Sequence, residues 1–306
     1  MNDALRSLAD AQGGVFTTTQ ARRVGVGDRG LARLRRDREV HTVARSVSST
    51  SPWRDGRLDA RLLVRTRAAL ALYPDARAVG VSALVLAGAP VHGVPSDRAD
   101  VVRPVHREVL TDLCRIRPPH PALRTLEPAP DASTRIAAAV VQSALDHGHV
   151  AAVVAADHAL QHRLVTREQI TAVADRVEGW PESGRVRTAL ALMDGRSESV
   201  GETLARLFVV GLGWSVTPQL PLRDAGGVFG YGDLGVDGTL LVLEFDGRVK
   251  YASDPDALWK EKRREDRGRR AGYLFERIIW SELDAPAVLG PRLVAARARA
   301  ERWPDV

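Results

Sequence analysis

The sequence predicts a mixed α/β protein in three parts: a small helical unit with a basic hairpin at 1–52, a mostly helical region at 53–195, and an α/β domain at 196–306. Apolar residues at helical spacing dominate the first two parts. After Ser197 the pattern changes to helix, three strands, helix and strand. A chain of 306 residues is long enough for two or three domains with a sizeable core.

Composition narrows the class of protein. The chain is 44% hydrophobic and 27% charged, which excludes wholesale disorder. Its one cysteine, Cys114, cannot form an internal disulfide or a cysteine-ligated zinc site, which favours a reducing compartment. The N-terminus is charged every few residues, unlike a signal peptide, and no stretch approaches the ~18 apolar residues of a membrane span. We therefore expect a cytoplasmic protein without a membrane partner.

The basic residues are unevenly distributed. Of the 44, three are lysines, and Lys250, Lys260 and Lys262 are consecutive among the basic positions. Such clustering arises roughly once in three hundred shuffles of lysine and arginine, two side chains that are not chemically interchangeable. The net charge of +6 and the pI near 10.0 also make nucleic acid a plausible partner.

The first part has a helix-turn-helix pattern. We expect helices at 4–11, 21–24 and 29–36, the last capped by Asp28, and a two-stranded wing within 39–45. The third helix turns Leu31 and Leu34 inward, and the second helix of such a motif enters the major groove of DNA. The expected DNA contacts are Thr18, Arg29, Arg33, Arg35, Arg36 and Arg45. The alternative is a solvated arginine helix packed on a neighbour, and spacing alone does not decide between them.

The middle part is predicted mainly helical, with short apolar stretches at 79–87 and 101–104. Its expected helices are 57–73, 131–147 and 150–162, and Thr166-Arg-Glu-Gln169 is a capping box that opens another. Two histidine pairs, His147 with His149 and His158 with His162, have metal-compatible spacing. No acidic residue lies between His158 and His162, where a zinc protease needs its general base, so we expect surface or capping histidines.

The last part carries the candidate chemistry. We expect helices at 199–211 and 254–271, and extended segments at 214–219, 228–233, 239–246 and 274–280. Asp233 is expected to end one strand, and Glu244 and Asp246 the next. Strand alternation places Glu244 and Asp246 on one face, and Mg²⁺ takes one or two carboxylates plus waters and substrate phosphate. A nearby lysine can orient the attacking water or stabilise charge on the phosphate.

These residues carry a family resemblance. The segments 199–206, Asp233, 244–251, 261–266 and 272–277 resemble the very-short-patch-repair-like branch of the PD-(D/E)XK endonuclease superfamily. The N-terminal part, through Gly14-Val-Phe-Thr17 and Ala21, is similar to the winged helix of AbiEi-family antitoxins. The middle part looks like the linking region of the same actinobacterial-type proteins, through 81–83, 92–93 and 155–157.

The resemblance implies a Mg²⁺ or Mn²⁺ site with Glu202, Asp233 and Glu244 at the metal. Asp246 stands where the superfamily pattern has lysine, which leaves the lysine's role to Lys250 or Lys262. A second departure is Gly268, which stands in mid-helix where a leucine would pack, at a cost of about 1 kcal/mol against alanine.

Each of these residues also has a purely structural interpretation. Ser199 and Glu202 form a capping box without any metal. Asp233 and Asp237, beside glycines, suit ordinary turns, and Asp246-Gly247 suits a hairpin. The run from 260 to 270 interleaves acidic and basic residues, which is also typical of a salt-bridged, solvated helix.

The expected function is that of a bacterial DNA-binding protein with a C-terminal Mg²⁺-dependent endonuclease domain. The alternative is a catalytically inactive AbiEi-like antitoxin, a transcriptional regulator that restrains a nucleotidyltransferase toxin. A third alternative is an interaction scaffold whose arginines serve only solubility.

Overall fold

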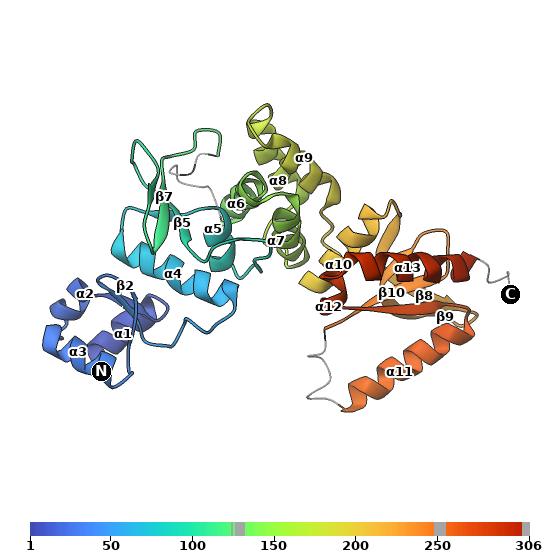
Figure 1. Ribbon diagram of the computed structural model, residues 1–306, viewed down its shortest axis with the longest axis horizontal. Coiled ribbons are helices and arrows are strands. Elements are labelled where there is room, and N and C mark those ends of the chain that lie inside the picture. Colours follow the sequence, from blue (N-terminus) through green and yellow to red (C-terminus); the bar gives the residue numbers. More distant parts are fainter. Residues whose placement is uncertain (124, 126–131, 248–254, 302–306) are drawn as a thin grey trace. The chain divides into compact units, whose positions relative to one another are not determined.

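The computed structural model describes residues 1–123, 125, 132–247 and 255–301, without the side chains of Ser133 and 255–260. The fold is mixed α/β and contains three sheets. The chain forms two compact units, Met1–Met193 and Asp194–Val306 (Figure 1).

The first unit begins with three helices and a three-stranded sheet. The helices are α1 (Asp3–Ala11), α2 (Thr18–Arg23) and α3 (Asp28–Arg36); the strands are β1 (Val15–Thr17), β2 (His41–Ala44) and β3 (Val47–Ser49), in the order β1-β3-β2. The Thr17 side chain accepts a hydrogen bond from Gln20 N, and the Gln20 side chain accepts one from Thr17 N, so a capping box starts α2. Leu5, Phe16 and Leu31 are fully buried between these elements.

Two details of this region differ from the prediction. Residues 39–45 hold β2 alone, and its antiparallel partner β3 lies just after them, so the wing is placed later than expected. The N-cap of α3 is Gly27 rather than Asp28. Asp28 is instead the first residue of the helix, and its carboxylate pairs with Arg22 of α2 at 2.8 Å.

The rest of the first unit combines a small sheet with a helical bundle. Strands β4 (Arg77–Ala78), β5 (Ala99–Val102), β6 (Val109–Leu110) and β7 (Cys114–Arg117) lie in the order β4-β5-β7-β6. The long helix α4 (Leu58–Leu72) packs on β5 and on β1–β3. The Trp53 indole donates a hydrogen bond to Thr42 O at 3.2 Å, which ties the segment before α4 to β2.

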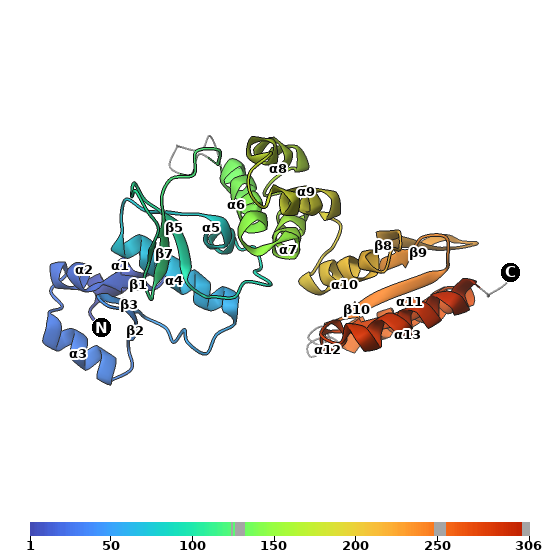
Figure 2. The same ribbon diagram turned by 45° about the horizontal axis from the view of Figure 1, so that its top comes forward.

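The helices of the bundle pack beside this sheet (Figure 2). They are α5 (Gly80–Leu86), α6 (Ala132–His147), α7 (His149–Gln161), α8 (Arg167–Ala174) and α9 (Ser183–Leu192), with a short 3₁₀ turn at Asp175–Val177. The apolar stretch at 79–87 is thus a helix, and it packs on α6 and β5. Thr166 and Gln169 form the predicted capping box of α8.

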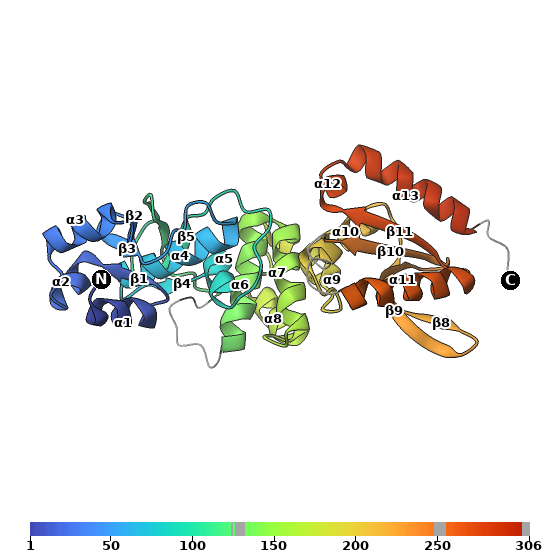
Figure 3. The ribbon, with the colours of Figure 1, turned by 90° about the horizontal axis from the view of Figure 1, so that it is seen from below.

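The second unit is a three-layer arrangement. Its elements are α10 (Val200–Gly211), β8 (Val216–Asp224), β9 (Gly227–Val236), β10 (Leu241–Asp246), α11 (Pro255–Arg270), β11 (Leu274–Ile279), α12 (Trp280–Leu283) and α13 (Pro286–Glu301). The sheet order is β11-β10-β9-β8. Figure 3 shows α13 and α11 on opposite faces of this sheet. Val209, Leu243 and Leu293 belong to the core on the α10 and α13 side, whereas Leu222, Val242 and Phe275 form the core on the other side.

The strand pairing corrects two expectations. Strand β10 pairs with β11 in parallel, so the chain after Asp246 makes a crossover through α11 and the hairpin interpretation of Asp246-Gly247 is wrong. Strand β9 continues past Asp233 to Val236, because Gly235 still pairs with both Thr217 and Val242. Asp233 therefore lies within its strand and does not end it.

Within the described residues, no helix has the length and apolar character needed to cross a membrane.

Candidate active site at the β9–β10 junction

Asp233 and Glu244 lie opposite each other where two strands separate. The antiparallel pairing of β9 with β10 includes Leu234 with Leu243, and the next opposed residues are Asp233 and Glu244. There Asp233 Oδ2 accepts a hydrogen bond from Phe245 N at 2.8 Å. The Asp233 carboxylate therefore binds a backbone amide of β10. This hydrogen bond holds Asp233 against the strand that carries Glu244.

Glu244 is buried and paired with an arginine. Its side chain faces the α11 layer, because Leu243 and Phe245 on either side of it belong to the opposite core. Arg264 of α11 donates to Glu244 Oε1 at 2.7 Å and also to Tyr231 O. Burial is the largest influence on the pKa of Glu244; it raises the pKa above its ordinary value, helped by the charge of Asp233 and opposed by Arg264.

Glu202 is also buried, and its carboxylate accepts two hydrogen bonds at the start of its own helix. Its two carboxylate oxygens accept hydrogen bonds from Glu198 N at 2.8 Å and from Ser199 Oγ at 2.9 Å. Ser199 in turn caps α10 by accepting a hydrogen bond from Glu202 N. These contacts match the capping interpretation of the Ser199–Glu202 pair. The amide that donates to the Glu202 side chain is that of Glu198, whereas in a standard capping box it is the amide of the N-cap residue, here Ser199.

The predicted ligand set is not gathered as tightly as a bound metal requires. In the described part of the chain, the one set of three metal-ligating side chains whose ligand atoms all lie within 4.8 Å of one another is Asp100, Asp146 and His147. Glu202, Asp233 and Glu244 do not form such a set, although Asp233 and Glu244 belong to adjacent strands.

The remaining predicted catalytic residues are spread around this junction. Asp246 is the last residue of β10, partly buried, two positions from Glu244 and hence on the same face. Lys262 is exposed on α11. Lys250 and the side chain of Lys260 lie outside the described residues. Lys262 is therefore the lysine of the three whose side chain is described.

Arg264 is a residue of the site that the sequence analysis missed. The unusual lysines were the expected cations near the carboxylates, whereas the cation at Glu244 is one of the many arginines. Residue spacing does not single out Arg264, because its contact with Glu244 depends on how α11 packs on the sheet.

Ion pairs fasten α11 to the sheet. Arg267 pairs with Asp224 of β8 at 2.5 Å, and Arg277 of β11 pairs with Glu261 at 3.3 Å and with Glu265 at 3.0 Å. Arg269 and Glu265 also form a pair within the helix at 2.6 Å. The helix is therefore salt-bridged, but it packs on the sheet and is not solvated on all sides.

The predicted DNA-binding residues lie on α3, in the turn of the β2–β3 hairpin and at the start of α2. Leu31 and Leu34 of α3 are buried, whereas Arg29, Arg33, Arg35 and Arg36 are exposed. Arg35 donates to Ser48 Oγ of β3 at 3.3 Å, which connects the helix to the hairpin. Arg45 is exposed in the turn between β2 and β3, and Thr18, at the start of α2, donates its amide to Ser46 O in that turn.

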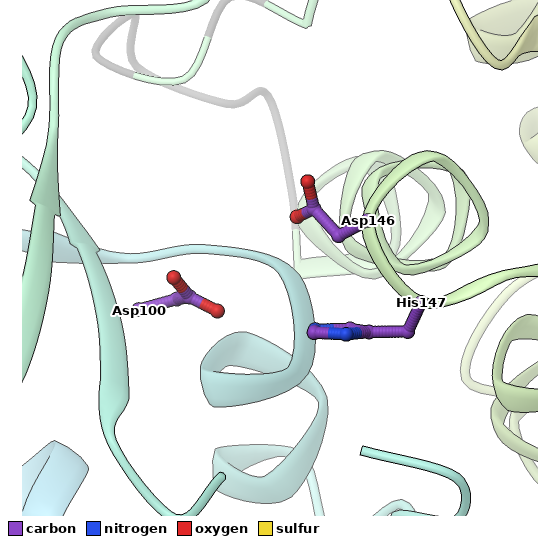
Figure 4. Close-up of side chains that lie close together, drawn as sticks. All are labelled: Asp100, Asp146 and His147. Carbon is purple, nitrogen blue, oxygen red and sulfur yellow. The ribbon is translucent and has the colours of Figure 1, made fainter. Parts of the chain in front are cut away.

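A second titratable cluster occurs in the first unit. Asp146 and His147 end α6, and Asp100 belongs to β5 (Figure 4). Arg117 donates to both Asp146 oxygens, at 3.2 and 2.7 Å, and to Asp100 Oδ1 at 3.2 Å. Burial is the main influence on two pKa values here: it raises the pKa of Asp100 and lowers the pKa of His147.

No protein-family model matches the chain, and the search of curated proteins gives no match either. The family resemblance noted from the sequence therefore remains an expectation.

Proposed function

We propose that the chain is a DNA-binding protein whose C-terminal unit hydrolyses phosphodiester bonds with Mg²⁺ or Mn²⁺. The observation that supports this proposal most directly is the opposition of Asp233 and Glu244 on adjacent strands where the pairing of β9 with β10 stops. The order of the elements around them, a helix, three strands, a helix and a parallel strand, is the order that the PD-(D/E)XK resemblance implies.

The donor set fits such a metal. Mg²⁺ binds proteins through one or two carboxylates and fills its other positions with water and substrate phosphate, so Asp233 and Glu244 suffice as protein ligands. Glu202 is the third expected ligand. Each of its carboxylate oxygens accepts one of the capping hydrogen bonds, and an ionised carboxylate has about four lone-pair sites, so these bonds do not exclude a role at the metal. A bound metal would supply an activated water and polarise the phosphate.

The protein's own residues then have separate roles. Arg264 orients Glu244 and compensates part of its charge. Asp246, on the same face, is placed to assist as a proton acceptor, and Lys262 or Lys250 is proposed to contact the phosphate being cleaved. In the N-terminal part, we propose that α3 and the β2–β3 hairpin form a winged helix-turn-helix whose arginines contact duplex DNA in the cytoplasm.

The direct test is cleavage of supercoiled, mismatched and single-stranded DNA by the full chain with Mg²⁺ or Mn²⁺. We expect Glu244→Ala and Asp233→Asn to abolish cleavage while DNA binding persists. Asp237→Asn is the matched control. Asp237 directly follows β9, its carboxylate is exposed, and it accepts a hydrogen bond from Thr217 Oγ1 at 2.8 Å. Cleavage that survives in Glu244→Ala would refute the catalytic proposal.

A second candidate function is supported by the hydrogen bonds of the carboxylates themselves. Glu202 is engaged in its helix cap and Glu244 in an ion pair, an arrangement that also suits a fold without catalysis. The protein would then be an AbiEi-like antitoxin that binds its own promoter and restrains a nucleotidyltransferase toxin. Sequence-specific footprinting without metal-dependent cleavage, together with a toxin reading frame alongside the gene, would favour this alternative.

A further inference from the structure

We propose that Asp100, Asp146 and His147 bind a divalent transition metal, with Zn²⁺ as the probe of choice. The three side chains come from two elements and point toward a common space (Figure 4), and their ligand atoms lie within 4.8 Å of one another. Two ligand atoms of a tetrahedral zinc lie about 3.4 Å apart, so side-chain movements on the order of 1 Å close the set around an ion. This site is separate from the proposed nuclease site, because it belongs to the first unit.

The strongest argument is an unsatisfied histidine. His147 Nε2 is buried and has no hydrogen-bond partner within the described structure, although buried polar atoms are nearly always paired. A metal ion between His147 and the two carboxylates would give this nitrogen a partner.

The charges of the cluster agree with a bound cation. The side chains of Asp100 and Asp146 are 8% and 17% exposed, and Arg117 is the one basic side chain with a described ion pair to either. Two carboxylates and one guanidinium leave a net negative charge in a largely buried place. His147 is also the last residue of α6, where the backbone carbonyls of a helix end favour a cation.

Arg117 is compatible with this role. An ionised carboxylate offers about four lone-pair sites, so Asp146 can accept from Arg117 and still coordinate an ion. Arg117 would then orient the ligands from outside the coordination sphere, as such partners commonly do. An imidazole nitrogen among the ligands favours Zn²⁺ and similar metals over Mg²⁺.

Calorimetric titration of the full chain with Zn²⁺ tests the proposal. We expect one ion to bind at this cluster, and we expect His147→Ala and Asp146→Asn each to weaken that binding by roughly tenfold or more. Two controls should bind like the wild type: His149→Ala, two residues away, and His162→Ala, which breaks the stacked surface pair His158–His162.

Each other result overturns the proposal. These are no binding, equal affinity in wild type and Asp146→Asn, or loss of binding in His149→Ala or His162→Ala. Circular dichroism establishes that each variant is folded. If His147→Ala does not fold, the wild-type chain with Co²⁺ decides, because visible absorption bands that Asp146→Asn abolishes report coordination at this cluster, and unchanged bands refute it.

Discussion

Two glycines set how closely the helices of the second unit approach its sheet. A Cβ atom at Gly201 of α10 would lie 2.0 Å from Cε1 of Phe245, and one at Gly268 of α11 would lie 2.6 Å from Cζ of Phe275. Both distances are far below van der Waals contact. The glycine at 268, where the resembling family would place a leucine, is therefore explained by an aromatic ring that occupies the space of a side chain.

We expect Gly268→Ala to destabilise the second unit by about 1–3 kcal/mol, because the clash with Phe275 outweighs the gain in helix propensity. Gly211 of α10 is the matched control, since nothing lies within 4 Å of a Cβ built there. Gly211→Ala should be neutral or stabilising by up to about 1 kcal/mol. Urea unfolding measures both values, and equal shifts in the same direction would contradict the packing argument.

Glu244 should make stability depend on pH. Its pKa is raised in the folded state, so the stability contributed by its protonated form is present below its ordinary pKa and is lost as pH rises through the folded value. Glu244→Gln should therefore be more stable than the wild type at pH 7.5. A difference of about 1 kcal/mol in the free energy of unfolding corresponds to a Tm higher by a few degrees.

The difference should shrink as the pH falls to about 4, where Glu244 of the wild type is itself largely protonated. Calorimetry at the two pH values measures it, with Asp237→Asn as the control for loss of an exposed charge. A Glu244→Gln variant that is less stable than the wild type at pH 7.5 would show that the ion pair with Arg264 outweighs the burial of the carboxylate.

At the scale of elements, α3 and the β2–β3 hairpin act as one structure. The helix buries Leu31 and Leu34 in the N-terminal core and exposes its arginines, while Arg35 reaches the hairpin through Ser48. Exposed guanidinium groups on one helix can each contact a phosphate and release a counterion from DNA.

Replacing Arg29 and Arg33 together by alanine should weaken DNA binding and lower the slope of log affinity against log salt by about 2, one for each lost phosphate contact. Fluorescence anisotropy over a range of salt concentrations measures the slope. Arg187→Ala on α9 removes an exposed arginine elsewhere in the same unit and should leave the slope unchanged. An unchanged slope in the double variant would favour the solvated-helix alternative.

Elements with a local signal could be predicted from the sequence, and those that depend on packing could not. The helix opened by Thr166 follows from its predicted capping box. Helix α2, expected from residue 21, begins at Thr18, and β4 and β6, with two residues each, have no periodicity to detect. Similarly, the proximity of Asp233 and Glu244 follows from their place on consecutive strands. The contact of Arg264 with Glu244 depends on how α11 packs, which residue spacing does not determine.

At the scale of the whole molecule, the chain contains separate cores. The second unit buries Val209, Leu243 and Leu293 with one another, and its largest buried side chains pack within that unit. The first unit has its own cores around Phe16, Trp53 and Leu62. Units with separate cores are able to unfold separately.

Differential scanning calorimetry of the full chain should therefore show two transitions. Gly268→Ala should lower the Tm of one of them and leave the other in place, because its clash is confined to the second unit. A single cooperative transition that moves as a whole would show that the two units stabilise each other.

The ion pair between Arg264 and Glu244 also has an evolutionary consequence. Loss of the arginine alone would leave the buried carboxylate of Glu244 without its counter-ion. Lineages that lose the arginine at position 264 should therefore tend to replace Glu244 as well, and positions 244 and 264 should vary together when related sequences are aligned.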